Sequence, residues 1–353
     1  MSASATKTHD QKIFGRFIVS PLPEAIFGGR VQLADVGGGD GDANAVVEAA
    51  EAQPDALPSA LYDAQGFMFL PGMDAISDNP DLLVRLSRLF GAEVEDYGQT
   101  LIAKNFVHET VPEIFIVSNI APAIKQPPAR PNPPLTENGE LPTQFPHRRG
   151  WHTDQSYRRP PPDVSLFYAV IPAPEGQGQT LYANGFAAYD ALSNDLKSRV
   201  ETLVGIHVMS GAGRNEYAVR AGEAPKDLEP HQRPQRQPVV RAHPVTGRRA
   251  LFLCEAGQMD WVDGPFVGME PGPDGAGAKL LYELMAHYTK PPFTYTHNWS
   301  RGDLVIYDNR SSIHAATWYD SYAHQRQMWR TTTWGDPGPE YDGEARSWIP
   351  KVG

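Results

Sequence analysis

The chain is poor in cysteine and has fewer basic than acidic residues, and both features exclude classes of protein. Cys254 is the only cysteine among 353 residues, so neither an internal disulfide nor a cysteine-rich zinc site can form. The formal net charge of −11 argues against a nucleic-acid-binding protein, because neutralising phosphates requires a broad basic face. It still allows a small anion to bind in a locally basic pocket.

Long apolar segments are also missing. No uncharged apolar run is long enough to span a bilayer, and the first ten residues lack the apolar segment of a signal peptide. We therefore expect a cytoplasmic protein that makes no membrane contact. Proline and glycine are abundant instead, with 33 and 32 residues, and this composition favours strands and loops over helices.

Hydrophobic patterning predicts a single domain over residues 1–353 that is mainly β with surrounding helices. Helical periodicity predicts helices at 43–52, 82–90, 187–203 and 280–288. Short apolar runs predict strands at 13–19, 31–33, 66–70, 113–117, 164–170, 180–182, 237–241, 249–253, 303–307 and 328–334.

Residues 122–146 are dense in proline, which cannot donate a backbone hydrogen bond and is therefore kept out of central strands. A loop of this length in a compact domain is typically functional or disordered. We predict that this segment is a lid over an active site.

The strongest local signal for chemistry is the sequence Trp151-His152-Thr153-Asp154. If this segment is a strand, His152 and Asp154 point to the same face, because side chains alternate along a strand. An imidazole and a carboxylate, together with a second histidine, make a triad that binds Fe(II) and leaves coordination positions open. A His-x-Asp pair is common by itself, however, and a structural pair is the alternative interpretation.

A second group of residues lies toward the C-terminus. His314 follows a predicted strand and a turn, so it can return to the same pocket; a surface or core histidine is the alternative. Arg326 and Arg330 fall on one face of a strand that includes both. Arginine suits bidentate binding of a carboxylate, such as the distal carboxylate of 2-oxoglutarate, whereas two solvated arginines are the alternative.

The ordered set of these motifs resembles the taurine dioxygenase and phenoxyacetate-herbicide dioxygenase (TauD/TfdA) family. The region before residue 100 matches more loosely than the rest. The matching blocks are Trp151–Asp154, Thr180–Asn184, Ala187–Leu192, Pro238–Gly247, Ala250–Phe252, Asp308–Arg310, His314, Arg326, Arg330 and Gly335-Asp336.

The resemblance implies a double-stranded β-helix, the jelly roll of the cupin type. It implies that His152, Asp154 and His314 bind Fe(II), and that Arg326 and Thr180 bind the distal carboxylate of 2-oxoglutarate. With O₂ as the second cosubstrate, the implied reaction is oxidation of a substrate C–H bond, and the carboxylate ligand favours hydroxylation. The implied place of Arg330 is beside an anionic group of the substrate.

Two positions depart from the taurine enzymes. Shortly after Phe90-Gly91, where those enzymes carry a substrate-binding histidine, this chain has Asp96. Four residues before His152, in place of their asparagine, it has Arg148. We therefore expect Arg330, Arg148 and Asp96 to contact a small organic acid other than taurine, such as a sulfonate, a sulfate ester or an aryloxyalkanoate.

Three other functions remain open at this point. A biosynthetic oxygenase acting on an amino-acid-derived metabolite would use the same residues. A metal-binding cupin without redox chemistry would have no need for Arg326, and a zinc hydrolase would need a general base beside the metal. Members of the family often form dimers or tetramers, so the resemblance also allows a homo-oligomer.

Overall fold

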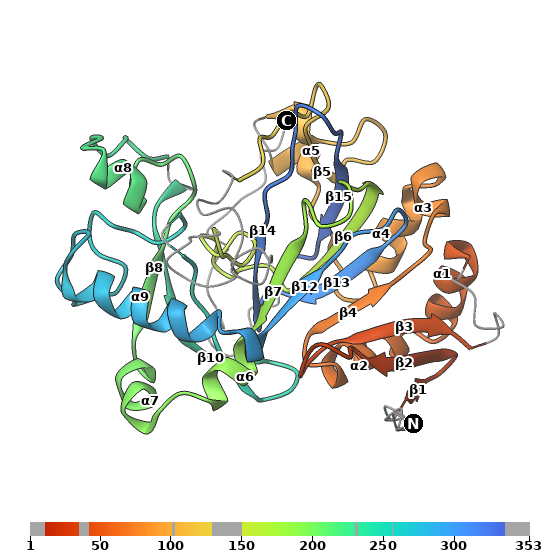
Figure 1. The fold of residues 1–353 in the computed structure, drawn as a ribbon, viewed down its shortest axis with the longest axis horizontal. Helices are drawn as coiled ribbons and strands as arrows, with labels where there is room; N and C mark the ends of the chain where they lie inside the picture. The colour runs from red at the N-terminus through yellow and green to blue at the C-terminus, as the bar shows by residue number, and fades with distance from the viewer. Residues whose placement is uncertain are drawn as a thin grey trace, which may run out of the picture.

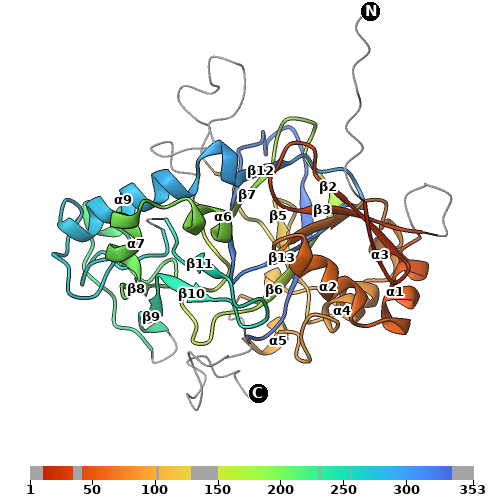
Figure 2. The ribbon, with the colours of Figure 1, turned by 90° about the horizontal axis from the view of Figure 1, so that it is seen from below.

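The computed structural model describes residues 11–34, 42–100, 103–128, 150–229, 232–255 and 257–335. The strands of two larger sheets gather at the centre, with helices α1–α4 on one side and α6–α9 on the other (Figures 1 and 2). Within the described ranges, no helix is long and apolar enough to cross a membrane.

The larger sheet has eight strands in the order β1-β2-β3-β4-β13-β6-β15-β5. All neighbouring strands are antiparallel except β3 and β4, which run parallel. The strands are β1 (Lys12–Phe14), β2 (Phe17–Pro21), β3 (Gly29–Leu33), β4 (Phe67–Leu70), β5 (Phe115–Ser118), β6 (Val164–Ile171), β13 (Leu304–Asp308) and β15 (Gln327–Thr332).

The smaller central sheet has three antiparallel strands, β12 (Thr294–His297), β7 (Thr180–Asn184) and β14 (Ser312–Ala316), with β7 in the middle. Its inner side chains pack against the larger sheet: the Tyr182 ring lies 4.6 Å from the Phe67 ring and 5.3 Å from the Tyr307 ring. Two antiparallel pairs complete the strands, β8 (Val204–His207) with β9 (Gln235–Pro238), and β10 (Val240–Ala242) with β11 (Arg249–Leu251).

Helices cover the outer faces of this double layer. On the side of the larger sheet lie α1 (Ala43–Ala52), α2 (Ala56–Asp63), α3 (Ala75–Asp78) and α4 (Asp81–Ser87). The remaining helical segments are α5 (Tyr97–Thr100), η1 (Lys104–Phe106), α6 (Gly185–Asp190), α7 (Asn194–Val200), α8 (Glu216–Arg220), α9 (Ala276–Tyr288) and η3 (Pro291–Phe293).

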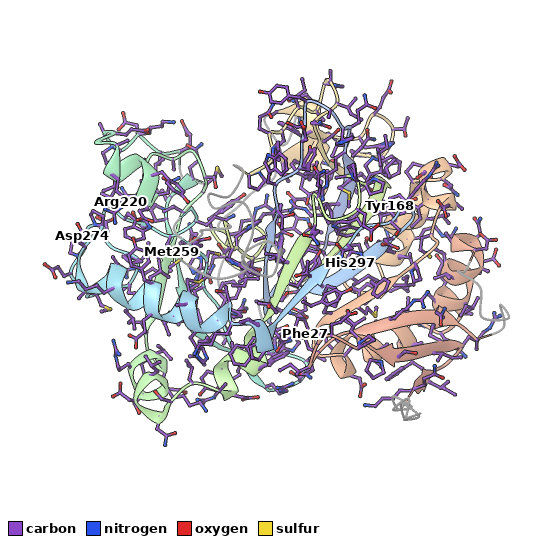
Figure 3. The ribbon with its side chains drawn as sticks, viewed as in Figure 1. Phe27, Tyr168, Arg220, Met259, Asp274 and His297 are labelled. Carbon is purple, nitrogen blue, oxygen red and sulfur yellow. The ribbon has the colours of Figure 1, made fainter. Side chains whose placement is uncertain are left out.

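Apolar side chains divide into three buried clusters. Tyr168 belongs to the cluster beneath α1, α2 and α4, and Met259 to the cluster beneath α6 and α9 (Figure 3). A third cluster, which includes Phe27 and Tyr182, lies between the two sheets. Burial of these clusters provides most of the free energy that favours this layered fold.

The predicted elements are confirmed in most places, but the fold class is confirmed only in its coarser form. Helices are more extensive than predicted, and the chain is a mixed α/β protein with substantial sheets. The predicted helix 187–203 is wrong as one element: it is two helices, because the Ser193 hydroxyl accepts a hydrogen bond from the Leu196 amide and starts α7 anew. The helix predicted to end at 90 ends at Ser87.

The predicted lid 122–146 falls largely outside the described residues, which stop at 128 and resume at 150. The single-domain organisation also stays a prediction.

A buried ionic network ties the end of β13 to the turn after β10. The Arg310 guanidinium donates two hydrogen bonds to the Asp308 carboxylate, at 2.9 and 2.6 Å, and lies 3.3 Å from Asp163. His243 lies 2.9 Å from the other side of Asp308 through Nε2. Because the His243 Nδ1 accepts hydrogen bonds from backbone amides, its Nε2 carries the proton and donates to Asp308.

We predict that Arg310→Leu lowers the free energy of unfolding by about 3 kcal/mol, because it leaves the buried Asp308 carboxylate without its main partner. Urea denaturation followed by circular dichroism measures this change. Arg248→Leu is the control, since its ion pair with Asp190 is 40% and 63% exposed and its loss costs less than about 1 kcal/mol. Equal losses in the two variants would contradict the structural role assigned to Arg310.

Candidate metal centre

Two backbone hydrogen bonds bring the predicted histidines together. The His152 amide donates to the His314 carbonyl at 3.0 Å, and the His314 amide donates to the His152 carbonyl at 2.7 Å. The two residues form an isolated antiparallel bridge, so their side chains project on the same side. Their ring centroids lie 4.3 Å apart.

The expected strand around His152 is wrong, because the segment has one bridge and then turns. Other contacts hold it in place. The Gly150 and Trp151 amides donate to the buried carboxylate of Glu255, at 2.7 and 2.9 Å. After Asp154, Gln155 adopts a left-handed backbone with φ of 48°, and its side-chain amide donates to the buried Glu95 carboxylate at 2.8 Å. Hydrogen bonds to Glu255 and Glu95 therefore hold the segment before His152 and after Asp154, respectively.

The tautomer of His152 follows from its backbone contact. Nδ1 lies 2.8 Å from the Gly150 carbonyl oxygen, which can only accept, so Nδ1 carries the proton. This leaves the Nε2 lone pair free to bind a metal ion. Burial lowers the pKa of His152, and burial together with the neighbouring His152 lowers the pKa of His314 to about 3. Both rings are therefore neutral at physiological pH, as metal ligands must be.

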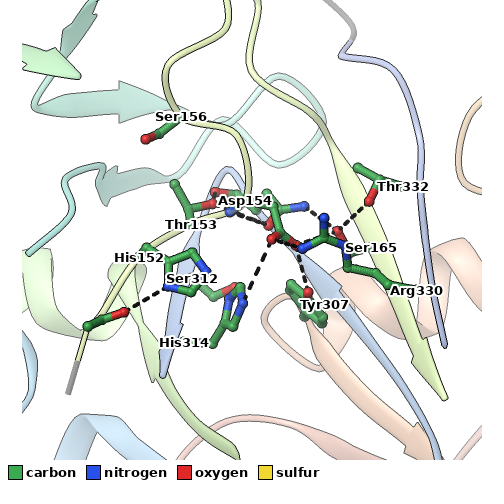
Figure 4. Close-up of polar contacts among 12 residues, drawn as sticks. His152, Thr153, Asp154, Ser156, Ser165, Tyr307, Ser312, His314, Arg330 and Thr332 are labelled. Atoms are coloured by element: carbon green, nitrogen blue, oxygen red, sulfur yellow. Dashed lines mark hydrogen bonds and ion pairs between the residues drawn. The ribbon is translucent and has the colours of Figure 1, made fainter. Parts of the chain in front are cut away.

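Both carboxylate oxygens of Asp154 have hydrogen-bond partners (Figure 4). Oδ2 accepts hydrogen bonds from the Tyr307 hydroxyl at 2.7 Å and the Ser165 hydroxyl at 2.9 Å. Oδ1 lies against the Arg330 guanidinium and 3.9 Å from His314 Nε2. Burial raises the pKa of Asp154, but Arg330, the two histidines and the Tyr307 hydroxyl together outweigh burial and hold that pKa well below its usual range. The group is a carboxylate with one oxygen facing the histidines.

His152, Asp154 and His314 fit a single divalent ion. Their ligand atoms lie within 4.8 Å of one another, so one ion reaches all three after small side-chain rotations. Two neutral imidazoles and one carboxylate suit a first-row transition metal and leave three positions of an octahedron open. The donor set and its fixed tautomer thus match the predicted iron site.

Arg326 is a buried cation that has no anionic partner among the described residues. Only 5% of its surface is exposed, and neither Nε nor Nη2 has a hydrogen-bond partner in the described part of the chain. The guanidinium lies between the rings of Phe167 and Tyr319, and burial lowers the pKa of Arg326 to about 10. Gly178, with φ of 57°, makes room for it, since a Cβ there would lie 3.2 Å from Arg326 Nε.

A cavity of about 570 Å³ connects the two features, because His152 and Arg326 both line it. Lys125 also lines it, and no carboxylate does so among the described residues. Apolar and aromatic side chains form much of the remaining wall, among them Val117, Tyr217 and Tyr319. A ligand in this cavity would therefore lie beside the metal site and near the two cations Lys125 and Arg326.

Thr180 lies at the start of β7, paired with Ala316 of β14. Its hydroxyl oxygen accepts a hydrogen bond from the Trp299 indole at 3.0 Å. Because that indole can only donate, the hydroxyl hydrogen of Thr180 is left to point to another acceptor.

The three residues expected to contact the substrate, Arg330, Arg148 and Asp96, are not brought together in the described part of the chain. Arg330 lies in β15 and contacts Asp154. Arg148 lies outside the described residues. Asp96 lines a separate hollow with Arg88 and accepts a hydrogen bond from the Gln99 side chain at 2.6 Å, so it contributes nothing to the cavity of His152.

Several contributing residues escaped the sequence analysis. Tyr97, the neighbour of Asp96, acts electrostatically on Arg330. Tyr307 and Ser165 hold Asp154, and Lys125 lies at the edge of the proline-rich segment. Period-2 patterning marks Tyr307 and Ser165 only as inward-facing strand residues, so it gives no signal for their hydrogen bonds.

Residues 20–332 match the family described as "Taurine catabolism dioxygenase TauD, TfdA family". The chain belongs to this family. Two relatives are a (S)-phenoxypropionate/alpha-ketoglutarate-dioxygenase of Sphingobium herbicidovorans, 35% identical over 195 residues, and an alpha-ketoglutarate-dependent 2,4-dichlorophenoxyacetate dioxygenase of Cupriavidus pinatubonensis, 36% identical over 190. The matches cover 54% and 53% of this chain but only 64% and 60% of those relatives.

The family fold agrees with a solved structure. The crystal structure of a putative alpha-ketoglutarate-dependent taurine dioxygenase from Burkholderia xenovorans superposes with a TM-score of 0.61 at 25% identity. The superposition covers 93% of this chain and 96% of the Burkholderia xenovorans chain. The resemblance inferred from the motifs is thus confirmed over nearly the whole length.

We predict that Tyr307→Phe weakens Mn(II) binding about 10-fold, because groups that orient a metal ligand contribute about 10- to 100-fold to affinity. Titration of free Mn(II) by electron paramagnetic resonance measures this. Tyr168→Phe, which removes a tyrosine hydroxyl bonded to Ser77, is the control and keeps the wild-type affinity. Wild-type affinity in Tyr307→Phe would show that Asp154 needs no support from this hydroxyl.

Proposed function

We propose that the protein is an Fe(II)- and 2-oxoglutarate-dependent dioxygenase that oxidises a C–H bond of a small organic acid. The observation that carries the proposal is the buried Arg326, which lines the same cavity as His152 and has no anionic partner in the part of the chain that the structure describes. Burying a guanidinium without an anion is costly, so the position favours a carboxylate ligand. We also propose that the two facing sheets form a double-stranded β-helix within one domain.

In this proposal, two groups of residues bind the two ends of 2-oxoglutarate, one of them through the metal ion. His152, Asp154 and His314 hold the metal, and Arg326 and Thr180 bind the distal carboxylate. Ferrous iron, when bound, supplies the chelation of the 2-oxo acid and the activation of O₂. Because only 5% of Arg326 is exposed, little water would screen its ion pair with the acid.

Two cations remain for the substrate. Within the described residues, Lys125 has no ion pair, and Asp154, Arg326 and Arg330 act electrostatically on its ammonium group. A metal ion held by Asp154 would take up part of its negative charge, so that Arg330 would be available to an anion, and the distal carboxylate would neutralise Arg326. Lys125 and Arg330 then favour an anionic substrate group, and the apolar cavity walls favour an apolar body.

An aryloxyalkanoate combines these two properties, as the names of the two relatives illustrate. Alkyl sulfonates and sulfate esters combine them as well. Hydroxylation of a carbon bonded to an ether or ester oxygen gives a product whose C–O bond then breaks, so cleavage would follow oxidation. A zinc hydrolase is less well supported, because the described lining of the cavity offers no carboxylate as a general base.

The first test is the visible charge-transfer band of the iron chelate, measured without oxygen with Fe(II) and 2-oxoglutarate. We expect a band in the wild type, none in His152→Ala, and about a 100-fold higher requirement for the acid in Arg326→Ala, since losing one partner of a buried charged pair costs about 2–5 kcal/mol. Arg301→Ala, an arginine 67% exposed, is the control. Absence of the band from the wild type at saturating Fe(II) and acid would refute the proposed function.

The second test concerns the substrate anion. With succinate release as the assay, the best acid of a panel of aryloxyacetates, alkyl sulfates and sulfonates is compared with its neutral amide. We expect Lys125→Met to raise the KM for the acid about 10-fold, as expected for loss of a charged contact of about 1.4 kcal/mol, and to leave the KM for 2-oxoglutarate unchanged. Lys279→Met, on the exposed face of α9, is the matched control. An amide that reacts as well as the acid would exclude recognition of an anion.

A further inference from the structure

Tyr182, at the centre of β7, has a hydroxyl group that the metal site does not use. The side chain is fully buried, and the hydroxyl has no hydrogen-bond partner within the described residues. An unpaired buried hydroxyl costs about 1–3 kcal/mol, so its persistence calls for an explanation.

The register of the small sheet places this residue between the metal site and Arg326. Tyr182 pairs with His314 on β14 and lies two residues after Thr180, so both side chains of β7 face the inside. The Tyr182 ring lies 5.9 Å from the His314 ring and 5.3 Å from the Tyr307 ring. On β7, Tyr182 is therefore the inward-facing residue opposite the metal ligand His314, and Thr180 is the next inward-facing residue toward the start of the strand.

The groups that act electrostatically on Tyr182 are Asp154, Arg326 and Tyr295, and those that act on Arg326 are Tyr319 and Tyr182. A tyrosine hydroxyl, whose ordinary pKa is about 10, carries its proton at physiological pH. It can therefore donate a hydrogen bond to an anion held by Arg326.

We propose that the Tyr182 hydroxyl donates a hydrogen bond to the distal carboxylate of 2-oxoglutarate, as a third contact beside Arg326 and Thr180. This inference rests on the proposed function. It accounts for three polar groups that lack an acceptor within the described residues: the Tyr182 hydroxyl, the Arg326 guanidinium and the hydroxyl hydrogen of Thr180. It also makes Tyr182 a specificity residue, which favours a 2-oxo acid with a carboxylate at its far end.

The test is the anaerobic affinity of Fe(II)-loaded protein for two acids, 2-oxoglutarate and 2-oxopentanoate, followed by calorimetry. 2-Oxopentanoate has the same chain length but ends in a methyl group. We expect Tyr182→Phe to raise the Kd for 2-oxoglutarate about 10-fold, since a hydrogen bond to a charged group is worth about 1.5–3 kcal/mol. The Kd for 2-oxopentanoate should stay within about twofold, since it lacks that carboxylate.

Tyr295→Phe is the matched control, because Tyr295 is the partner of Tyr182 on β12 and its hydroxyl lies 3.2 Å from His297 instead. It should change neither Kd. Ligand-free Tyr182→Phe should also melt no lower than the wild type, because the lost hydroxyl has no partner there.

Four results decide the matter. An unchanged Kd for 2-oxoglutarate in Tyr182→Phe overturns the inference, as does equal weakening of both acids. A lower melting temperature of the ligand-free variant also overturns it, because the hydroxyl would then have a structural partner. Failure of the wild type to bind 2-oxoglutarate refutes the proposed function itself, and is distinguishable because it does not depend on the variant.

Discussion

The backbone bridge between His152 and His314 is the constraint on which the site depends. The two residues are far apart in the sequence, and only the exchanged amide-to-carbonyl hydrogen bonds place both imidazoles on one side. β14 supplies one half of the bridge as part of a sheet, whereas the other half is a loop residue clamped by Glu95 and Glu255 through its neighbours. Main-chain geometry thus sets the positions of the two histidines, which is part of the preorganisation that such sites require.

The charged groups around Asp308 and those around the cavity differ in how they are paired. Around Asp308, each charge has an opposite partner: Arg310 and His243 surround the carboxylate, and the network is closed. Around the cavity the charges are unbalanced, because neither the buried Arg326 nor the exposed Lys125 has an anionic partner in the described residues. Buried charges without partners are rare in proteins unless a ligand supplies the partner. This contrast distinguishes a structural arginine from a binding one within the same strand-rich core.

The sequence was sufficient to predict the site residues that stand in a recognisable order along the chain. The His-x-Asp pair, His314 and Arg326 form an ordered pattern, and the family match confirms the membership that this pattern indicated. Residues whose role depends on tertiary contacts gave no such signal. Tyr307 and Ser165 look like ordinary inward-facing strand residues, yet they hold Asp154. Asp96 was chosen by its distance from a helix end, but the backbone turns its neighbour Tyr97 inward, and Asp96 lines another hollow.

The central claim is that one metal ion and one dicarboxylic 2-oxo acid together complete this cavity. The most direct measurement is an anaerobic crystal structure of the protein with Mn(II) and 2-oxoglutarate, with the metal located by anomalous scattering. The account predicts a single metal peak between His152, Asp154 and His314, and the far carboxylate of the acid against Arg326. A metal bound elsewhere, or an acid whose far carboxylate leaves Arg326 unpaired, would contradict it.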